Sequence, residues 1–230
     1  MLLNILTGTI VLVFRPYTFK DVWQLLKYAR PISKLVQYHT MSTSQPADPQ
    51  TGVSNPVYSV HLTTEINAPF ETVWEVLTDL PKYHEWNPFV RSMTVVDESD
   101  PNGQVPQVLE VGKGLVMICN IPPSLSDRKD ARTVNELIKV VDPVNGTLSW
   151  QNIDYPNWAM QAQRWQTLTR TSDGTTSYDT HEDFNGVLAY FLKWFLGKSL
   201  VESFQGFVTG LKSRSESLAA GTGTGAGAGN

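Results

Sequence analysis

The sequence predicts an α+β domain in which one curved antiparallel sheet of seven strands wraps around a long C-terminal helix. Three observations support this fold class. Residues 89–185 consist of β-branched and aromatic runs separated by turn-forming segments. A strand pattern and two short helical patterns precede these runs, and one long helical pattern follows them. The last pattern contains so many aromatic residues that only an enclosing sheet can bury them.

The domain opens with one strand and two short helices. Residues 57–66, VYSVHLTTEI, show the partial alternation and β-branched content of a strand. A helix follows, because Asn67 is a capping residue, Pro69 suits a first helical turn, and apolar residues then recur at helical spacing. A second short helix is expected before Asn87 and Pro88, since the residue before a proline is disfavoured in helical conformation.

Six further strands are expected between the helices. They are assigned to residues 89–97, 107–121, 131–141, 147–153, 159–171 and 175–184. Their separators are rich in Pro, Gly, Asn and Asp, and the pairs Asn145-Gly146 and Asp173-Gly174 are typical of hairpin turns. Consecutive strands joined in this way form an antiparallel meander.

The final predicted element is one amphipathic helix over residues 186–218. Its first half is apolar on nearly all sides, because Tyr190 and Trp194 lie opposite the apolar stripe that contains Phe191 and Phe195. That half is therefore expected to be enclosed by the sheet. The second half is rich in Lys, Ser and Glu and is expected to be half exposed.

Composition divides the chain into four parts. Residues 57–218 form the predicted domain, residues 42–56 a flexible linker, and residues 219–230 a disordered Gly-rich tail. Residues 1–41 combine an apolar run, shorter than the ~20 residues of a membrane span, with a basic helical pattern. Two interpretations of this segment stay open: a presequence or interfacial anchor, or a stretch upstream of a true start at Met41.

Charge and cysteine content restrict the partners and the compartment. The net charge is −4, but residues 1–41 carry five basic residues and one acidic residue, so the rest of the chain is at −8. Such an acidic body argues against a nucleic-acid partner. The single cysteine, Cys119, gives no sign of an oxidising compartment. A cytoplasmic protein is expected, with membrane contact only through residues 1–41 and a mitochondrial or membrane-associated location if they are retained.

Several of these features together resemble a known superfamily. The stretch APFETVWEVLTDLPKYHEWNPFVR, the stretch YDTHEDFNGVLAYFL and the long final helix are similar to the START-like (SRPBCC) superfamily with the helix-grip fold, in its polyketide cyclase/dehydrase and lipid transport branch. The resemblance covers residues 57–217 and is most specific from Pro69 to Pro88. It implies a deep pocket for lipids, sterols, polyketides or other apolar molecules between the sheet and the final helix.

The polar stretch YHEWNPFVR has two parts in this interpretation. Trp86, Asn87 and Pro88 are assigned to a structural elbow that leaves the short helix and enters the next strand. Tyr83 and His84 are candidates for the mouth of the pocket, and a solvated surface position is the alternative for His84.

The walls of the pocket follow from strand alternation. Glu182 shares a face with Tyr178 on the last strand, so a carboxylate there must be paired or protonated, and Arg164 on the neighbouring strand is the candidate partner. This pair is the predicted anchor for the polar head of a ligand, and a purely structural ion pair is the alternative. The remaining candidate ligand-binding residues are Trp150, Met160, Ala162, Tyr190, Phe191, Trp194 and Phe195.

The sequence contains no recognised catalytic, metal-binding or phosphate-binding motif, and no cofactor is predicted. The leading hypothesis is therefore a binding or transport protein for a small hydrophobic molecule. An enzyme of polyketide cyclase or dehydratase type is one alternative, with Tyr83, His84 and Glu182 as its proton-transfer groups. An interaction module related to chaperone activators is the other.

Overall fold

The structure is a computed structural model that describes residue 53, residues 55–97 and residues 104–223. The predictions for residues 1–41, for most of the linker and for the end of the tail lie outside these residues. Val53, inside the segment assigned to the linker, is buried.

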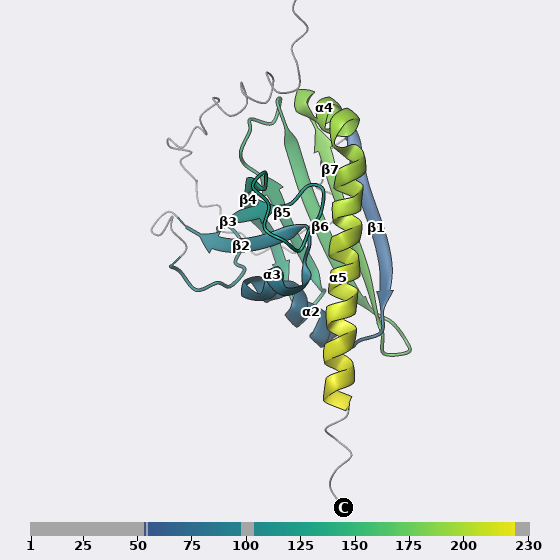
Figure 1. Ribbon diagram of the computed structural model, residues 1–230. Coiled ribbons are helices and arrows are strands. Elements are labelled where there is room, and N and C mark those ends of the chain that lie inside the picture. Colours follow the sequence, from purple (N-terminus) through teal and green to yellow (C-terminus); the bar gives the residue numbers. More distant parts are fainter. Residues whose placement is uncertain (1–52, 54, 98–103, 224–230) are drawn as a thin grey trace, which may run out of the picture. The chain divides into compact units, whose positions relative to one another are not determined.

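Seven strands form one antiparallel sheet, as predicted (Figure 1). They are β1 (Tyr58–Ile66), β2 (Val90–Val96), β3 (Gly114–Cys119), β4 (Arg132–Asp142), β5 (Thr147–Asn152), β6 (Gln161–Arg170) and β7 (Thr176–Asn185). Their order across the sheet is β1-β7-β6-β5-β4-β3-β2, so the last strand returns to pair with the first while the others follow the chain. The short turns predicted between the strands account for this meander.

Strand β3 is shorter than the sequence pattern indicated. The run at 107–121 contributes only Gly114–Cys119 to the sheet. The preceding residues form an irregular segment in which the Gln107 side chain accepts a hydrogen bond from the Val95 N–H at 2.8 Å and donates one to the Val95 carbonyl at 3.2 Å. One amide side chain thus satisfies the backbone N–H and carbonyl of Val95 on the edge strand β2.

Three short helical segments cross from β1 to β2: α2 (Phe70–Thr78), the 3-10 turn η1 (Leu80–Lys82) and α3 (Tyr83–Trp86). The expected capping role of Asn67 is wrong. Pro69 occupies the N-cap position of α2 without a side-chain cap, and the Asn67 N–H donates to the Glu216 carboxylate at 2.8 Å.

The final helix is two helices rather than one. α4 (Val187–Phe195) ends at Leu196, whose φ of −123° departs from helical geometry, and α5 (Gly197–Gly223) then continues past the predicted end at residue 218. The break leaves only one side of α4, with Leu188, Ala189 and Leu192, against the core. The predicted enclosure of the aromatic first half is therefore wrong, and its aromatic side chains are exposed.

The elbow after α3 is a structural feature, as predicted. The Trp86 ring is buried and meets the Phe207 ring of α5 edge to face, with the ring centroids 5.4 Å apart. Asn87 is fully buried, and its side-chain oxygen accepts hydrogen bonds from the N–H groups of Phe89 and Val90 at 3.0 and 2.9 Å. These bonds hold the chain as it turns from the helix into β2.

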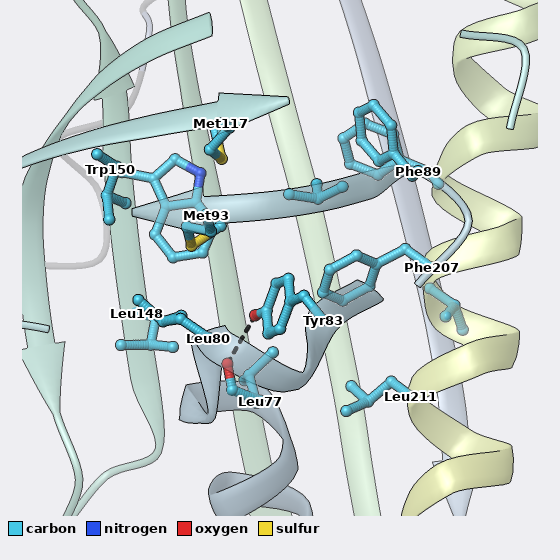
Figure 2. Close-up of a cluster of buried hydrophobic side chains, with 14 of the residues drawn as sticks. Leu77, Leu80, Tyr83, Phe89, Met93, Met117, Leu148, Trp150, Phe207 and Leu211 are labelled. Carbon is cyan, nitrogen blue, oxygen red and sulfur yellow. Dashed lines mark hydrogen bonds between the residues drawn. The ribbon is translucent and has the colours of Figure 1, made fainter. Parts of the chain in front are cut away.

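Two glycines let α5 lie directly on this elbow. A Cβ at Gly210 would stand 2.4 Å from the Trp86 carbonyl oxygen, and a Cβ at Gly206 would stand 2.9 Å from the Pro88 ring. Because the two glycines are four residues apart, they share one face of α5. Figure 2 shows Phe207 and Leu211 of the same helix directed toward Tyr83 and the core.

Replacing Trp86 by alanine should reduce the free energy of unfolding by about 3 to 5 kcal/mol, because a large buried ring is removed. Chemical denaturation of the variant measures the loss. His84→Ala is the matched control, since His84 is exposed two residues away on α3, and it should cost little. Equal, small losses in the two variants would contradict the core assignment of Trp86.

Gly210→Ala should destabilise the fold by about 1 to 3 kcal/mol, although alanine is the better helix former, because the added methyl group collides with the Trp86 backbone. Gly221→Ala in the same helix is the control, because a Cβ there meets nothing within 4 Å. It should stabilise the protein slightly or leave it unchanged. If both variants melt at or above the wild-type temperature, the close contact at Gly210 is not a constraint on the fold.

Candidate ligand-binding site

The candidate site lies on the concave face of the sheet, where three strands place one residue each in a single row. Trp150 of β5 pairs with Arg164 of β6, and Arg164 pairs with Glu182 of β7. Ala162 and Tyr178 belong to the same face, and both are buried. The alternation predicted for β6 and β7 is confirmed by this register.

Arg164 is the central polar residue of the row. Only 3% of it is exposed, and its guanidinium carbon lies 4.4 Å from the ring centroids of both Phe204 and Phe207 of α5. The rings attract the cation through their negative faces. Nε donates to the Thr180 hydroxyl at 3.3 Å, but Nη2 is buried without a hydrogen-bond partner among the described residues. The site therefore holds one unused, charged donor.

Two carboxyl groups face the same interior, and burial changes the ionisation of both. Desolvation raises the pKa of Glu182 to about 7, although the Arg164 charge acts in the opposite direction. Burial also raises the pKa of Glu136 on β4 well above its usual value, and repulsion from Glu182 adds to this effect. The predicted Arg164–Glu182 pair is adjacent in register, but no ion pair within 4.0 Å joins the two side chains.

Tyr83 and His84 do not belong to this site. Tyr83 is fully buried, and its hydroxyl donates to the Leu77 carbonyl at 2.7 Å, as Figure 2 shows. It lies in the core rather than at a pocket mouth. His84 is exposed, and its Nδ1 lies 2.8 Å from the Pro81 carbonyl oxygen. His84 therefore occupies a surface position, which was the alternative to a place at the pocket mouth.

The apolar candidates divide into two groups. Trp150, Met160 and Ala162 are buried, and Trp150 stands beside Met93 and Met117 in Figure 2. The other group, on α4, points away from the concave face into solvent. It consists of Tyr190, Phe191, Trp194 and Phe195. α4 therefore does not close the site with these rings, and the row is closed by Phe204 and Phe207 of α5 instead.

The sequence analysis missed Glu136, Phe204 and Phe207 as members of the site. Glu136 could have been found, because it alternates with Ile138 along β4 and therefore shares the buried face of that strand. The two phenylalanines lie within the helix predicted over residues 186–218, but no sequence signal shows that they flank an arginine.

The hollows on the surface of the described part of the chain include one at α4 and α5 and a smaller one near the elbow. A groove of about 470 Å³ follows the junction of α4 and α5. It is lined by Tyr58, Lys193, Gly197, Lys198, Val201, Glu202 and Gln205. A smaller hollow of about 120 Å³ lies beside Trp86 and Arg214. Neither includes Trp150, Arg164 or Glu182, so an interior pocket lined by these residues stays a prediction.

Tyr58 links the larger groove to the concave face of the sheet. Its ring stacks on Phe184 with the centroids 5.9 Å apart, and its hydroxyl donates to the Gly197 carbonyl at 3.0 Å. Phe184 lies on the concave face, two residues from Glu182 on β7. Tyr58 therefore lines the groove and also contacts a residue of the concave face.

Within residues 55–97 and 104–223, no group of three or more His, Cys, Asp or Glu side chains is arranged to hold a metal ion. Cys119 is buried, and desolvation raises the pKa of its thiol, which makes it a poor nucleophile. None of the helices in these two ranges is long and apolar enough to cross a membrane.

Comparison with known proteins identifies the family. The sequence profile of the family described as polyketide cyclase / dehydrase and lipid transport matches residues 58–216. The chain belongs to this family, as its resemblance to the START-like superfamily predicted.

Individual relatives are distant. The chain is 24% identical over 153 residues to "Oxopyrrolidines biosynthesis cluster protein O" of Penicillium oxalicum, a match that covers 59% of this chain and 75% of that protein. Among solved structures, hypothetical protein jhp0584 of Helicobacter pylori gives a TM-score of 0.58 at 11% identity and covers 77% of this chain and 99% of its own. Ara h 8.0201 gives 0.51 at 12% identity, covering 70% and 98%. These structures share the fold.

The raised pKa of Glu182 predicts a pH-dependent stability. Between its ordinary value of 4.5 and about 7, the folded protein keeps a proton that the unfolded chain has released. The contribution of Glu182 to the free energy of unfolding is therefore complete below this interval and is lost as the pH rises through it. The raised pKa of Glu136 likewise makes the free energy of unfolding fall as the pH rises.

Glu182→Gln should flatten the profile, because glutamine is neutral at every pH. Urea unfolding of the wild type and of the variant across the same pH interval measures the difference between them. That difference should grow as the pH rises toward 7. Two parallel profiles would show that Glu182 is not desolvated in the folded protein.

Proposed function

We propose that the protein binds a small apolar molecule with a polar head, and that Arg164 receives this head. The family description names cyclases, dehydrases and lipid transport, and these activities share the binding of a small organic molecule. The observation that carries the proposal is the buried Nη2 of Arg164 without a hydrogen-bond partner. A buried, charged donor left unpaired is costly, and an acceptor oxygen of a ligand removes that cost.

The surroundings of Arg164 indicate which ligands fit. Phe204 and Phe207 on α5, with Trp150 on β5, offer an apolar environment on both sides of the guanidinium. Glu136 and Glu182 favour their protonated forms, so the negative charge that would repel an acidic head is reduced at low pH. A lipid, sterol or polyketide-like molecule with a carbonyl, carboxylate or sulfonate head matches this set.

The enzyme alternative has weaker support. It required at least two of Tyr83, His84 and Glu182 to meet at one place. The Tyr83 hydroxyl is already bound to the Leu77 carbonyl inside the core, and His84 is exposed on α3. Glu182 alone faces the site, and a single carboxyl does not define a reaction.

A matched pair of fluorescent probes tests the proposal. Anilinonaphthalene sulfonate and uncharged phenylnaphthylamine share an apolar body and differ in the sulfonate head. Arg164→Met should weaken binding of the charged probe by about 10- to 100-fold, because a charge-assisted hydrogen bond is lost, and should change binding of the neutral probe little. Titration of each probe, with a melting curve for each variant, gives the result.

Two controls complete this test. Arg170→Met removes an exposed arginine further along the same strand and should leave both affinities unchanged. Ala162→Trp places a large ring on the concave face beside Arg164 and should weaken both probes together. If the folded Arg164→Met variant loses both probes equally or neither, Arg164 does not receive the polar head. If Ala162→Trp folds and binds both probes as the wild type does, the concave face is not the binding site.

A further inference from the structure

Six large apolar side chains are exposed together at one end of the domain. On α4 the exposed fractions are 55% for Val187, 53% for Tyr190, 42% for Phe191, 75% for Trp194 and 56% for Phe195. Their positions repeat every three to four residues, so all five share one side of the helix, and the prediction that Tyr190 and Trp194 lie opposite Phe191 and Phe195 is wrong. Trp158, 74% exposed, lies beside the start of α4, because its carbonyl accepts the Val187 N–H at 3.2 Å. We call these six residues the α4 aromatic face.

The exposure of this face follows from the backbone geometry at the start of α4. The Leu188 N–H donates to the Ala159 carbonyl at 2.9 Å, and Ala189 is fully buried. Gly186 has a φ of +93°, and a Cβ there would lie 2.7 Å from the Ala159 carbonyl oxygen. A left-handed glycine in close contact with the preceding loop sets the direction in which α4 leaves β7. The opposite side of α4 therefore packs against the core, and the aromatic face is exposed at the surface.

The charge around the face is positive, in contrast to the acidic body of the domain. Residues 186–201 contain Lys193 and Lys198 and no Asp or Glu. The side chain of Lys198 is 92% exposed, and its nearest carboxylate is that of Glu202 at 3.9 Å. The residues outside 1–41 together carry a net charge of −8, so residues 186–201 are a locally basic stretch of an otherwise acidic part of the chain.

We propose that the α4 aromatic face is a membrane-docking surface that inserts shallowly into the headgroup region of an anionic lipid bilayer. Trp and Tyr combine an apolar ring with a polar group, which suits the boundary between headgroups and acyl chains. Lysine beside such rings adds attraction to anionic lipids. Aromatic residues are also enriched at protein interfaces, but lysine is depleted there, so the lysines beside these rings favour a lipid surface over a protein partner.

This inference assigns membrane contact to the folded domain, whereas the sequence analysis assigned it to residues 1–41 alone. Docking through α4 is peripheral, since no helix within residues 55–97 and 104–223 could span a bilayer. It also places the groove at the junction of α4 and α5 next to the lipid, because Lys193 and Lys198 line both the groove and the surroundings of the face.

Vesicle binding by the full chain tests the proposal. The protein is sedimented with phosphatidylcholine vesicles and with vesicles that also contain phosphatidylserine. Trp194→Ser combined with Tyr190→Ser should weaken binding to the mixed vesicles by about tenfold or more, because two rings no longer enter the interface. Lys193→Gln should weaken binding to the vesicles that contain phosphatidylserine by about fivefold. It should leave binding to pure phosphatidylcholine vesicles unchanged. Val144→Ser, an equally exposed apolar residue at the β4–β5 hairpin, is the matched control and should have no effect.

A second readout separates docking by α4 from any contribution of residues 1–41, which all variants retain. Brominated phosphatidylcholine should quench part of the tryptophan fluorescence, and Trp194→Phe should remove much of that quenching. If Trp194→Phe leaves the quenching unchanged, or if the double variant binds vesicles as tightly as the wild type, the proposal is wrong. The proposal is also wrong if the wild type does not bind vesicles but forms a dimer, and Trp194→Ser dissociates that dimer. The α4 aromatic face is then an interface between two copies of the chain.

Discussion

The close contact between α5 and the elbow after α3 is the constraint on which the rest of the structure depends. Gly206 and Gly210 bring the helix backbone against Pro88 and Trp86, a distance that no larger residue permits. That position also determines where the next side chains of α5 fall. Phe207, between the two glycines in sequence, contacts the Trp86 ring on one side and the Arg164 guanidinium on the other. The packing of the elbow and the geometry of the candidate site are therefore set by the same stretch of helix.

Several weak interactions together offset the cost of burying the Arg164 charge in the interior of the domain. Two aromatic rings lie 4.4 Å from the Arg164 guanidinium carbon, one hydroxyl accepts from Nε, and two nearby carboxyl groups respond to the charge. None of these contacts is a full ion pair, and Nη2 is left over. A structural arginine in a core normally has all its donors satisfied. Other buried atoms, such as Asn87 Nδ2 and Arg91 Nε, also lack a hydrogen-bond partner among the described residues, so it is the place of Arg164 on the concave face, between two aromatic rings of α5, that marks its Nη2 as a candidate ligand contact.

Local sequence rules were sufficient for the sheet and for the elbow, where the deciding contacts are close in the chain. Turn chemistry at Asn145-Gly146 and Asp173-Gly174 predicted the hairpins β4–β5 and β6–β7, and Asn87-Pro88 marked the elbow. The same rules failed at Leu196, because the stretch around it contains no proline and a single glycine is a weak signal for a break. They also failed for Trp194, since an apolar pattern shows that a side avoids water but not which partner covers it. Arg164 was found by alternation, whereas its contacts with Phe204 and Phe207 depend on long-range packing.

The break at Leu196 divides the C-terminal part of the chain into two units of different cooperativity. α5 is anchored along its length by the core, so its opening requires most of the domain to unfold. α4 has nine residues and contacts the core through one side only, so it can open on its own. Such local opening uncovers the end of the concave face near Phe184 while the Trp86 contact stays intact. It follows that the backbone amides of α4 should exchange with solvent faster than those of α5, although the two helices are consecutive in the chain.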